Sequence, residues 1–111
     1  MSDRKLLELA AKAAGMELDY TIRPDKKAFY HSERNALALV DGGWFAPLTD
    51  DGDALRLAVK LRMSVFHSLS DVYVVDDDGD IEVEEGHKRD PLAATRRAIV
   101  RVAAEIGRGM T

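Results

Sequence analysis

The chain has 111 residues, of which 46% are hydrophobic and 32% charged, and a formal net charge of −4. This length and composition predict one folded domain over residues 1–111 rather than a disordered chain. The absence of cysteine excludes disulfides, the lack of any apolar run near ~18 residues argues against a membrane span, and the acidic balance disfavours a general nucleic-acid binder.

A first helix is predicted between a cap at Ser2 or Asp3 and an end at Gly15. Ser2 or Asp3 can accept hydrogen bonds from the free amides at its start, and Gly15 stands where a left-handed residue ends a helix. The charged N-terminal residues lack the apolar core of a signal peptide, which predicts an intracellular protein. Apolar residues at helical spacing predict one buried face: Leu6, Leu9, Ala10 and Ala13, widened by Leu7 and Ala14.

The segment 19–47 is less regular. Residues 20–22 are β-prone, and residues 28–31 and 36–40 are predicted to pair as strands around a turn at 32–35. The alanines and leucines of 36–40 would equally suit a helical turn. Asp41-Gly42-Gly43 predicts another turn, because these residues tolerate a positive φ.

A second helix is predicted after Thr49, which we expect to be its cap. Asp50, Asp51 and Asp53 place negative charge against the positive end of the helix. Its apolar stripe is broad, so we expect a well-buried helix: Ala54, Leu57, Ala58 and Leu61, widened by Leu55 and Val59.

Strands follow this helix. Residues 64–69 mix β-branched, aromatic and polar residues, and residues 72–75 and 81–84 read as a hairpin around the loop that contains Gly79. Alternation predicts that Ile81 and Val83 face the core, while Glu82 and Glu84 face water.

The last helix begins at Asp90-Pro91, a cap followed by proline at the first helical position. Its apolar face repeats at Thr95, Ile99, Val102 and Ile106, and we expect Gly107 and Gly109 to end it. The predicted fold class is therefore α+β, with three helices packed on a mainly antiparallel sheet of about four to five strands, a sandwich of helix and sheet layers.

Three segments resemble a signature of small bacteriophage and prophage proteins. They are PLTDDGDALRLA at 47–58, ATRRAIV at 94–100 followed by Ala103 and Glu105-Ile106-Gly107, and LLELAAKAAG at 6–15. The chain thereby resembles the phage ABA sandwich domain family, whose members are mostly of unknown function. The resemblance implies helices packed on a sheet, a phage origin and a place in the cytoplasm of a bacterial host. It supplies no catalytic residues, and it leaves residues 19–40 as a candidate insertion.

The candidate metal sites are weak. The acidic stretch 76–80 fails as a calcium loop, because Ile81 and His87 stand where an EF-hand needs glycine and glutamate. Asp50, Asp51 and Asp53 can hold magnesium in principle, but stabilisation of the helix start explains them equally well. The histidines His31, His67 and His87 lack metal-ligand spacing.

Two groups of residues are candidates for partner binding. Arg97, Arg101 and Arg108 fall on one stripe of the last helix, which is typical either of a phosphate-contacting surface or of a solvated face. Trp44 and Phe45 follow two glycines, and they predict either a partner hot spot or a cover over the edge of the core.

These observations favour a non-enzymatic accessory protein that binds a host or phage protein, without cofactor or metal. The alternative is nucleic-acid binding through the basic face of the C-terminal helix. A third class is a metal-dependent enzyme that uses the three aspartates at 50, 51 and 53. No membrane partner is expected, and the sequence does not predict the oligomeric state.

Overall fold

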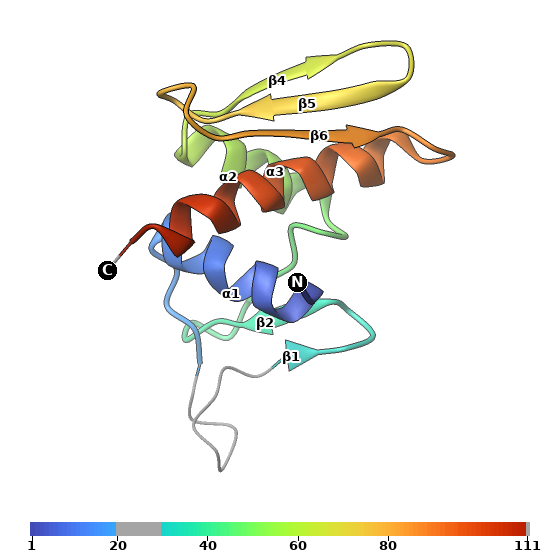
Figure 1. The fold of residues 1–111 in the computed structure, drawn as a ribbon. Coiled ribbons are helices and arrows are strands. Elements are labelled where there is room, and N and C mark those ends of the chain that lie inside the picture. The colour runs from blue at the N-terminus through green and yellow to red at the C-terminus, as the bar shows by residue number, and fades with distance from the viewer. Residues whose placement is uncertain (20–29, 111) are drawn as a thin grey trace.

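The computed structural model describes residues 1–19 and 30–110, and in this part of the chain it shows three helices and two three-stranded antiparallel sheets (Figure 1). The predicted α+β class is confirmed, but the strands form two small sheets instead of one sheet of four to five strands. In chain order the elements are α1 (Asp3–Ala14), β1 (Tyr30–His31), β2 (Ala36–Ala38), β3 (Trp44–Phe45), α2 (Asp51–Lys60), β4 (Ser64–His67), β5 (Asp71–Val75), β6 (Glu82–Gly86) and α3 (Pro91–Arg108).

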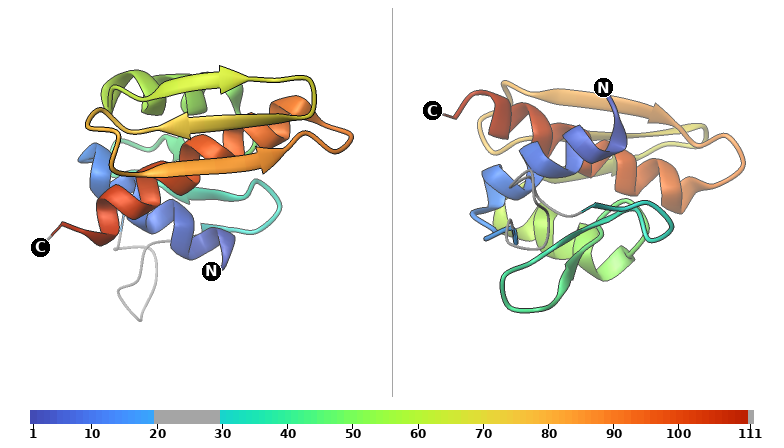
Figure 2. Two further views of the ribbon diagram at one scale, coloured as in Figure 1. Left: turned by 45° about the horizontal axis from the view of Figure 1, so that its top comes forward. Right: turned by 90° about the horizontal axis from the view of Figure 1, so that it is seen from below.

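The helices lie between the two sheets (Figures 1 and 2). One sheet, in the order β4-β5-β6, packs one face on α3, and the other, in the order β1-β2-β3, packs on α1 through β2. The strands divide into two sheets because α1 and α3 pack closely on each other and keep the strands apart.

The predicted ends of α1 are confirmed. The Ser2 hydroxyl accepts a hydrogen bond from the Lys5 amide at 3.2 Å, which satisfies one of the free donors at the start of the helix. Gly15 ends the helix with a φ of +69°, a conformation that glycine adopts without a steric penalty.

The helix α3 departs from its prediction at its C-terminal end. Asp90 caps it and Pro91 opens it, as expected, but the helix continues to Arg108, so Gly107 is a buried residue inside it. A methyl group added at Gly107 would lie 2.0 Å from the Leu9 carbonyl oxygen of α1. The glycine therefore permits close packing of two helices rather than ending one of them.

The helix α2 differs from expectation in its cap and in its burial. The cap is Asp50, whose carboxylate accepts from the Asp53 amide at 2.8 Å, and not Thr49. The helix buries only one narrow stripe, because Leu55 and Val59 are 64% and 68% exposed. The prediction that these two residues widen a buried face was wrong, since α2 lies at the margin of the helix layer.

The hairpin of β5 and β6 is confirmed, and β4 completes its sheet. Val74 lies opposite Val65 on β4 and Val83 on β6, so this row of side chains faces the helices. Val72, Val74 and Val83 are buried, whereas Glu82 and Glu84 are exposed, as alternation predicts.

The pairing of residues 30–31 with 36–38 is confirmed as well. Tyr30 lies opposite Leu37, and Asn35 in the connecting turn has a φ of +49°. The alternative of a helical turn at 36–40 is excluded over 36–38, where β2 forms and is buried on both sides. The strand predicted at 20–22 and the first residues of the one predicted at 28–31 lie outside the described residues.

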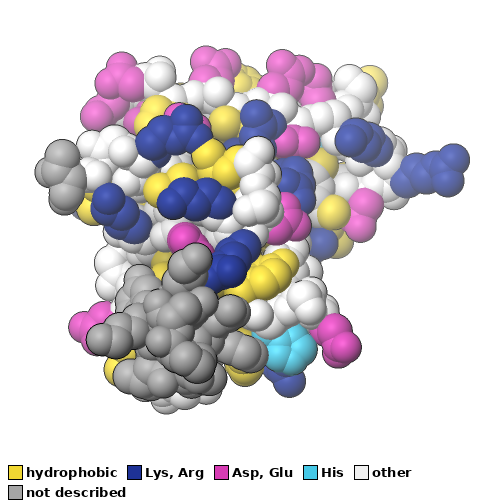
Figure 3. Space-filling view, turned by 60° about the horizontal axis from the view of Figure 1, so that its bottom comes forward, with side chains coloured by type: hydrophobic (Ala, Val, Ile, Leu, Met, Phe, Trp, Pro, Cys, Tyr) yellow, Lys and Arg dark blue, Asp and Glu magenta, His cyan; other side chains and the backbone are white. Residues whose placement is uncertain are grey.

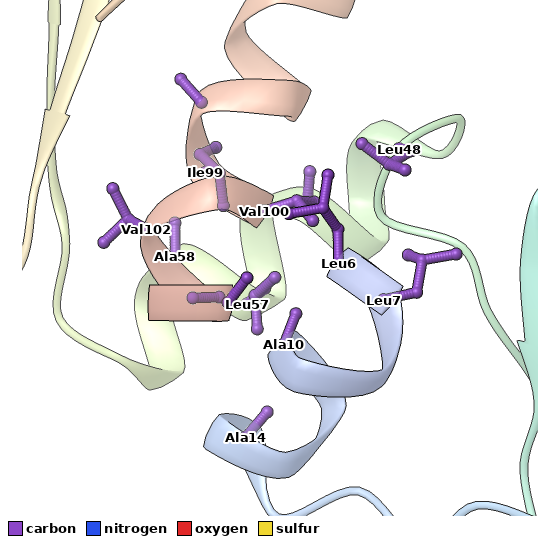
Figure 4. Close-up of a cluster of buried hydrophobic side chains, with 14 of the residues drawn as sticks. Leu6, Leu7, Ala10, Ala14, Leu48, Leu57, Ala58, Ile99, Val100 and Val102 are labelled. Atoms are coloured by element: carbon purple, nitrogen blue, oxygen red, sulfur yellow. The ribbon is translucent and has the colours of Figure 1, made fainter. Parts of the chain in front are cut away.

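The core joins side chains from all three helices (Figure 4). Leu6 and Leu7 come from α1, Leu57 from α2, and Ile99 and Val100 from α3, and Leu6 and Val100 point toward each other where the two helices meet. None of the described helices is long and apolar enough to cross a membrane.

Candidate functional site

The outer face of the β4-β5-β6 sheet carries a pair of stacked aromatic side chains. Phe66 on β4 and Tyr73 on β5 are directly opposite in the strand register, and their ring centroids are 5.1 Å apart with an angle of 26° between the planes. The other face of the sheet rests on α3 (Figure 2, left). On the outer face, Phe66 and Tyr73 remain 50% and 38% exposed. A cross-strand aromatic pair stabilises the sheet, and where it is open to solvent it also offers apolar area to a partner.

Carboxylates border the aromatic pair. Glu84 on β6 lies opposite Tyr73 on β5, Glu82 lies opposite Val75, and Asp71 opens β5 one row away on the same face. We call this surface the acidic aromatic face and define it by Phe66, Asp71, Tyr73, Val75, Glu82 and Glu84.

Two of these carboxylates influence each other. The hydrogen bond from the Ser68 hydroxyl, at 2.5 Å, is the main cause that holds the pKa of Asp71 below its usual value. The neighbouring Asp71 in turn raises the pKa of Glu84. Negative charge is therefore concentrated at this point of the face, and a bound cation would relieve the repulsion.

The sequence around this face has no compensating positive charge. Eight of the chain's 20 Asp and Glu residues fall between residues 63 and 86, and this segment contains none of the 16 Lys and Arg residues. The rest of the chain carries a net positive charge, and it meets the sheet along β6, where Arg101 pairs with Glu85. Aromatic rings beside carboxylates are a combination that recognises guanidinium and ammonium groups.

The arginine stripe predicted on α3 does come together in space. Arg97, Arg101 and Arg108 line a groove of about 640 Å³ between α3, β6 and Met1. Figure 3 shows the face formed by α1 and α3, where Lys and Arg side chains stand among hydrophobic ones. The same groove is also lined by four carboxylates, those of Asp80, Glu82, Glu85 and Glu105.

Each of the three arginines has a carboxylate partner. Arg97 donates to Asp3 at 2.9 Å, Arg101 donates to Glu85, and Arg108 lies 3.5 Å from Glu105. Partial burial acts to raise the pKa of Asp3, but hydrogen bonds from Arg97 and Asn35 outweigh it, so this pKa lies below its usual value. A phosphate would have to displace these carboxylates, which weakens the case for nucleic acid.

Trp44 and Phe45 have different environments. Phe45 is only 4% exposed and belongs to the core, so its ring is not presented to a partner. Trp44 is half-buried, packs edge-on against His31 at 5.5 Å, and lies under the Arg34 guanidinium at 5.3 Å. This arrangement places Trp44 as a cover at the edge of the small sheet.

The aspartates at the start of α2 take part in structural contacts. Asp50 caps the helix, Asp53 accepts from the Ala46 amide at 2.9 Å and pairs with Arg56, and Asp51 pairs with Arg96 at 2.6 Å. Within residues 1–19 and 30–110, no group of three or more acidic or histidine side chains is arranged to hold a metal ion.

The acidic aromatic face was not singled out from the sequence. The alternation that assigns Glu82 and Glu84 to water also assigns Tyr73 to the same side, once the hairpin register is known. Phe66 joins them only through the pairing of β4 with β5. The available signal was the run of carboxylates without Lys or Arg, which marks this sheet as one charged surface.

Comparison of the chain with protein-family models, with curated proteins and with solved structures finds no match. The resemblance to the phage ABA sandwich family stays a prediction. The argument for function therefore rests on the surfaces described above.

Proposed function

We propose that this chain is a non-enzymatic protein-binding module whose acidic aromatic face takes a basic segment of a partner protein. The observation that carries the proposal is the exposed Phe66–Tyr73 stack among carboxylates. The rings supply flat apolar area and cation–π contacts, and the carboxylates supply charge-assisted hydrogen bonds to Arg or Lys.

The charge distribution supports a protein partner over a nucleic acid. The face carries only negative charge, which repels phosphates, and the arginines of the α3 groove are each engaged with a carboxylate. Nucleic-acid binding through α3 remains the alternative, and it has the shared groove of Arg97, Arg101 and Arg108 in its favour.

The biological setting follows from the resemblance alone. We propose a phage or prophage accessory protein that acts in the cytoplasm of a bacterial host on a host or phage protein. A basic partner would complement the chain's net charge of −4, and electrostatic attraction would speed the encounter.

Affinity purification with matched variants tests this proposal. The immobilised wild-type chain, Tyr73→Lys and Leu92→Lys are each incubated with a bacterial lysate, and retained proteins are identified by mass spectrometry. Both substitutions place lysine at an exposed apolar position, but Leu92 is on α3 and not on the acidic aromatic face. We expect a basic protein that the wild type and Leu92→Lys retain and that Tyr73→Lys loses.

The retained protein is then purified and titrated by calorimetry at ~0.05 M and ~0.5 M salt, where screening lengths differ severalfold. Binding through paired charges should weaken markedly at the higher salt concentration. Retention by Tyr73→Lys at the wild-type level would refute this face as the site.

A further inference from the structure

The strand β4 forms an open edge of its sheet. The Ser68 amide donates to the Asp71 carbonyl at 2.9 Å, which makes 68 and 71 a hydrogen-bonded pair. Because such pairs alternate along an antiparallel ladder, Phe66 bonds to Tyr73 and the next such pair is Ser64 and Val75. The backbone N–H and C=O groups of Val65 and His67 therefore point away from β5, toward the outside of the sheet.

This edge lacks the charged residues and prolines with which proteins often block strand edges. Residues 63–70 contain no charged residue, no proline and no glycine. The opposite edge is different, because β6 carries Glu82, Glu84 and Glu85. One edge of the sheet is thus protected by charge, and the other is left able to pair.

Exposed apolar side chains lie along the open edge. Phe66 lies on β4 itself, and the fully exposed Leu69 follows it in the turn. The helix α2 precedes β4 in the chain, and its Leu55 and Val59 are exposed as well. Exposed apolar groups beside unpaired backbone groups are the components of a strand-to-strand interface.

We propose that β4 pairs antiparallel with β4 of a second copy of this chain, around a two-fold axis at Phe66. Val65 then lies opposite His67 of the other copy, and His67 lies opposite its Val65. These two pairs use the outward N–H and C=O groups of both residues, which gives four hydrogen bonds between the copies. The result is one continuous six-stranded sheet.

The occupant is a second copy because the edge is complementary to itself. An antiparallel pairing of identical strands is symmetric, and a strand without charged residues brings no like charges into opposition. Phe66 meets Phe66 of the other copy in a non-hydrogen-bonded pair, where side chains approach most closely. The Phe66–Tyr73 stacks of the two copies would then form one aromatic row across the dimer.

Molar mass measured by light scattering and sedimentation tests this proposal. We expect wild-type particles of about twice the chain mass of 12.3 kDa, in equilibrium with monomer on dilution. His67→Pro removes an outward N–H while keeping the β4–β5 ladder, and should shift the equilibrium to monomer. Glu84→Pro is the matched control on the outer edge of β6. Glu84 is a non-hydrogen-bonded partner of Tyr73, so its N–H also points away from the sheet, and its removal should leave the dimer intact.

A second variant tests the same interface in case His67→Pro does not fold. Phe66→Lys places two ammonium groups opposite each other at the axis and should also give monomer, whereas Tyr73→Lys on the central strand should remain dimeric. The latter variant separates dimerisation from the proposed binding of a basic partner. A wild type that stays monomeric up to ~1 mM, or a dimer that survives both His67→Pro and Phe66→Lys, would overturn the proposal.

Discussion

Gly107 lies where the backbones of α1 and α3 come closest. The Gly107→Ala variant gains helix propensity, but its methyl group would overlap the Leu9 carbonyl, which is rigid backbone and cannot move aside alone. We expect a net destabilisation of about 1–3 kcal/mol from forcing the helices apart. Urea denaturation followed by circular dichroism measures the change in free energy of unfolding.

Gly109→Ala is the matched control, because the nearest atom to an added methyl group there is 3.6 Å away. This variant should unfold at nearly the wild-type urea concentration. Equal stability of both variants would mean that α1 and α3 do not approach each other as closely as described.

Ile99 is the second position at which one residue controls the packing. It is buried near the middle of α3 and belongs to the core to which α1 and α2 also contribute (Figure 4). Ile99→Ala should cost about 2–4 kcal/mol, because it leaves a cavity among side chains held by three helices. A measured loss below ~1 kcal/mol in the same urea titration would show that the site collapses freely or is not buried.

At the scale of elements, the features that depend on neighbouring residues were predicted well from the sequence. The features that depend on contacts between distant segments were not. The cap at Asp90, the ending at Gly15 and the hairpin of β5 and β6 depend on residues within a few positions of each other. The exposure of Leu55 depends instead on where α2 sits in the helix layer. Division of the strands into two sheets likewise depends on the packing of α1 against α3, which has no local signature.

The candidate sites follow the same rule. The alignment of Arg97 with Arg101 came from helical geometry within α3. Their partners did not, since Asp3 lies 94 residues from Arg97 and Glu85 lies on another element. The stack of Phe66 on Tyr73 likewise required the register of β4, which the turn at 68–70 determines through its hydrogen bonds.

The ion pair of Asp3 with Arg97 joins α1 to α3 and predicts a pH dependence. Because the pKa of Asp3 in the folded protein lies below its usual value of 3.8, the ion pair stabilises the fold above that pH. This stability is lost as the pH falls through the lower pKa of the folded state. The side chains are 40% and 34% exposed, so screening limits the effect at pH 7 to about 0.5 kcal/mol.

The variant Asp3→Asn isolates this contribution. Thermal unfolding of the wild type and the variant should differ slightly at pH 7 and converge as the pH falls from ~5 toward ~2. A difference that stays constant over this range would assign the effect to packing or to the hydrogen bond with Asn35 instead.

At the scale of the whole molecule, the pairing of the α3 arginines with carboxylates predicts weak binding to DNA. We expect the wild type to bind labelled duplex or single-stranded DNA only weakly at physiological salt, because the carboxylates of the α3 groove compete with phosphates for the same arginines. Fluorescence anisotropy at two salt concentrations measures this affinity.

The double variant Arg97→Glu/Arg101→Glu gives the decisive comparison. Micromolar binding by the wild type that falls steeply with salt and disappears in this variant would favour nucleic acid over a basic protein partner. Equally weak binding by both proteins would agree with the proposed function.

The distribution of acidic residues also has a consequence for purification. An ion-exchange resin senses the surface that turns toward it more than the overall charge of a protein. All 16 Lys and Arg residues lie outside residues 63–86, where eight carboxylates are concentrated. At neutral pH and low salt, the protein should therefore adsorb to an anion exchanger mainly through this sheet.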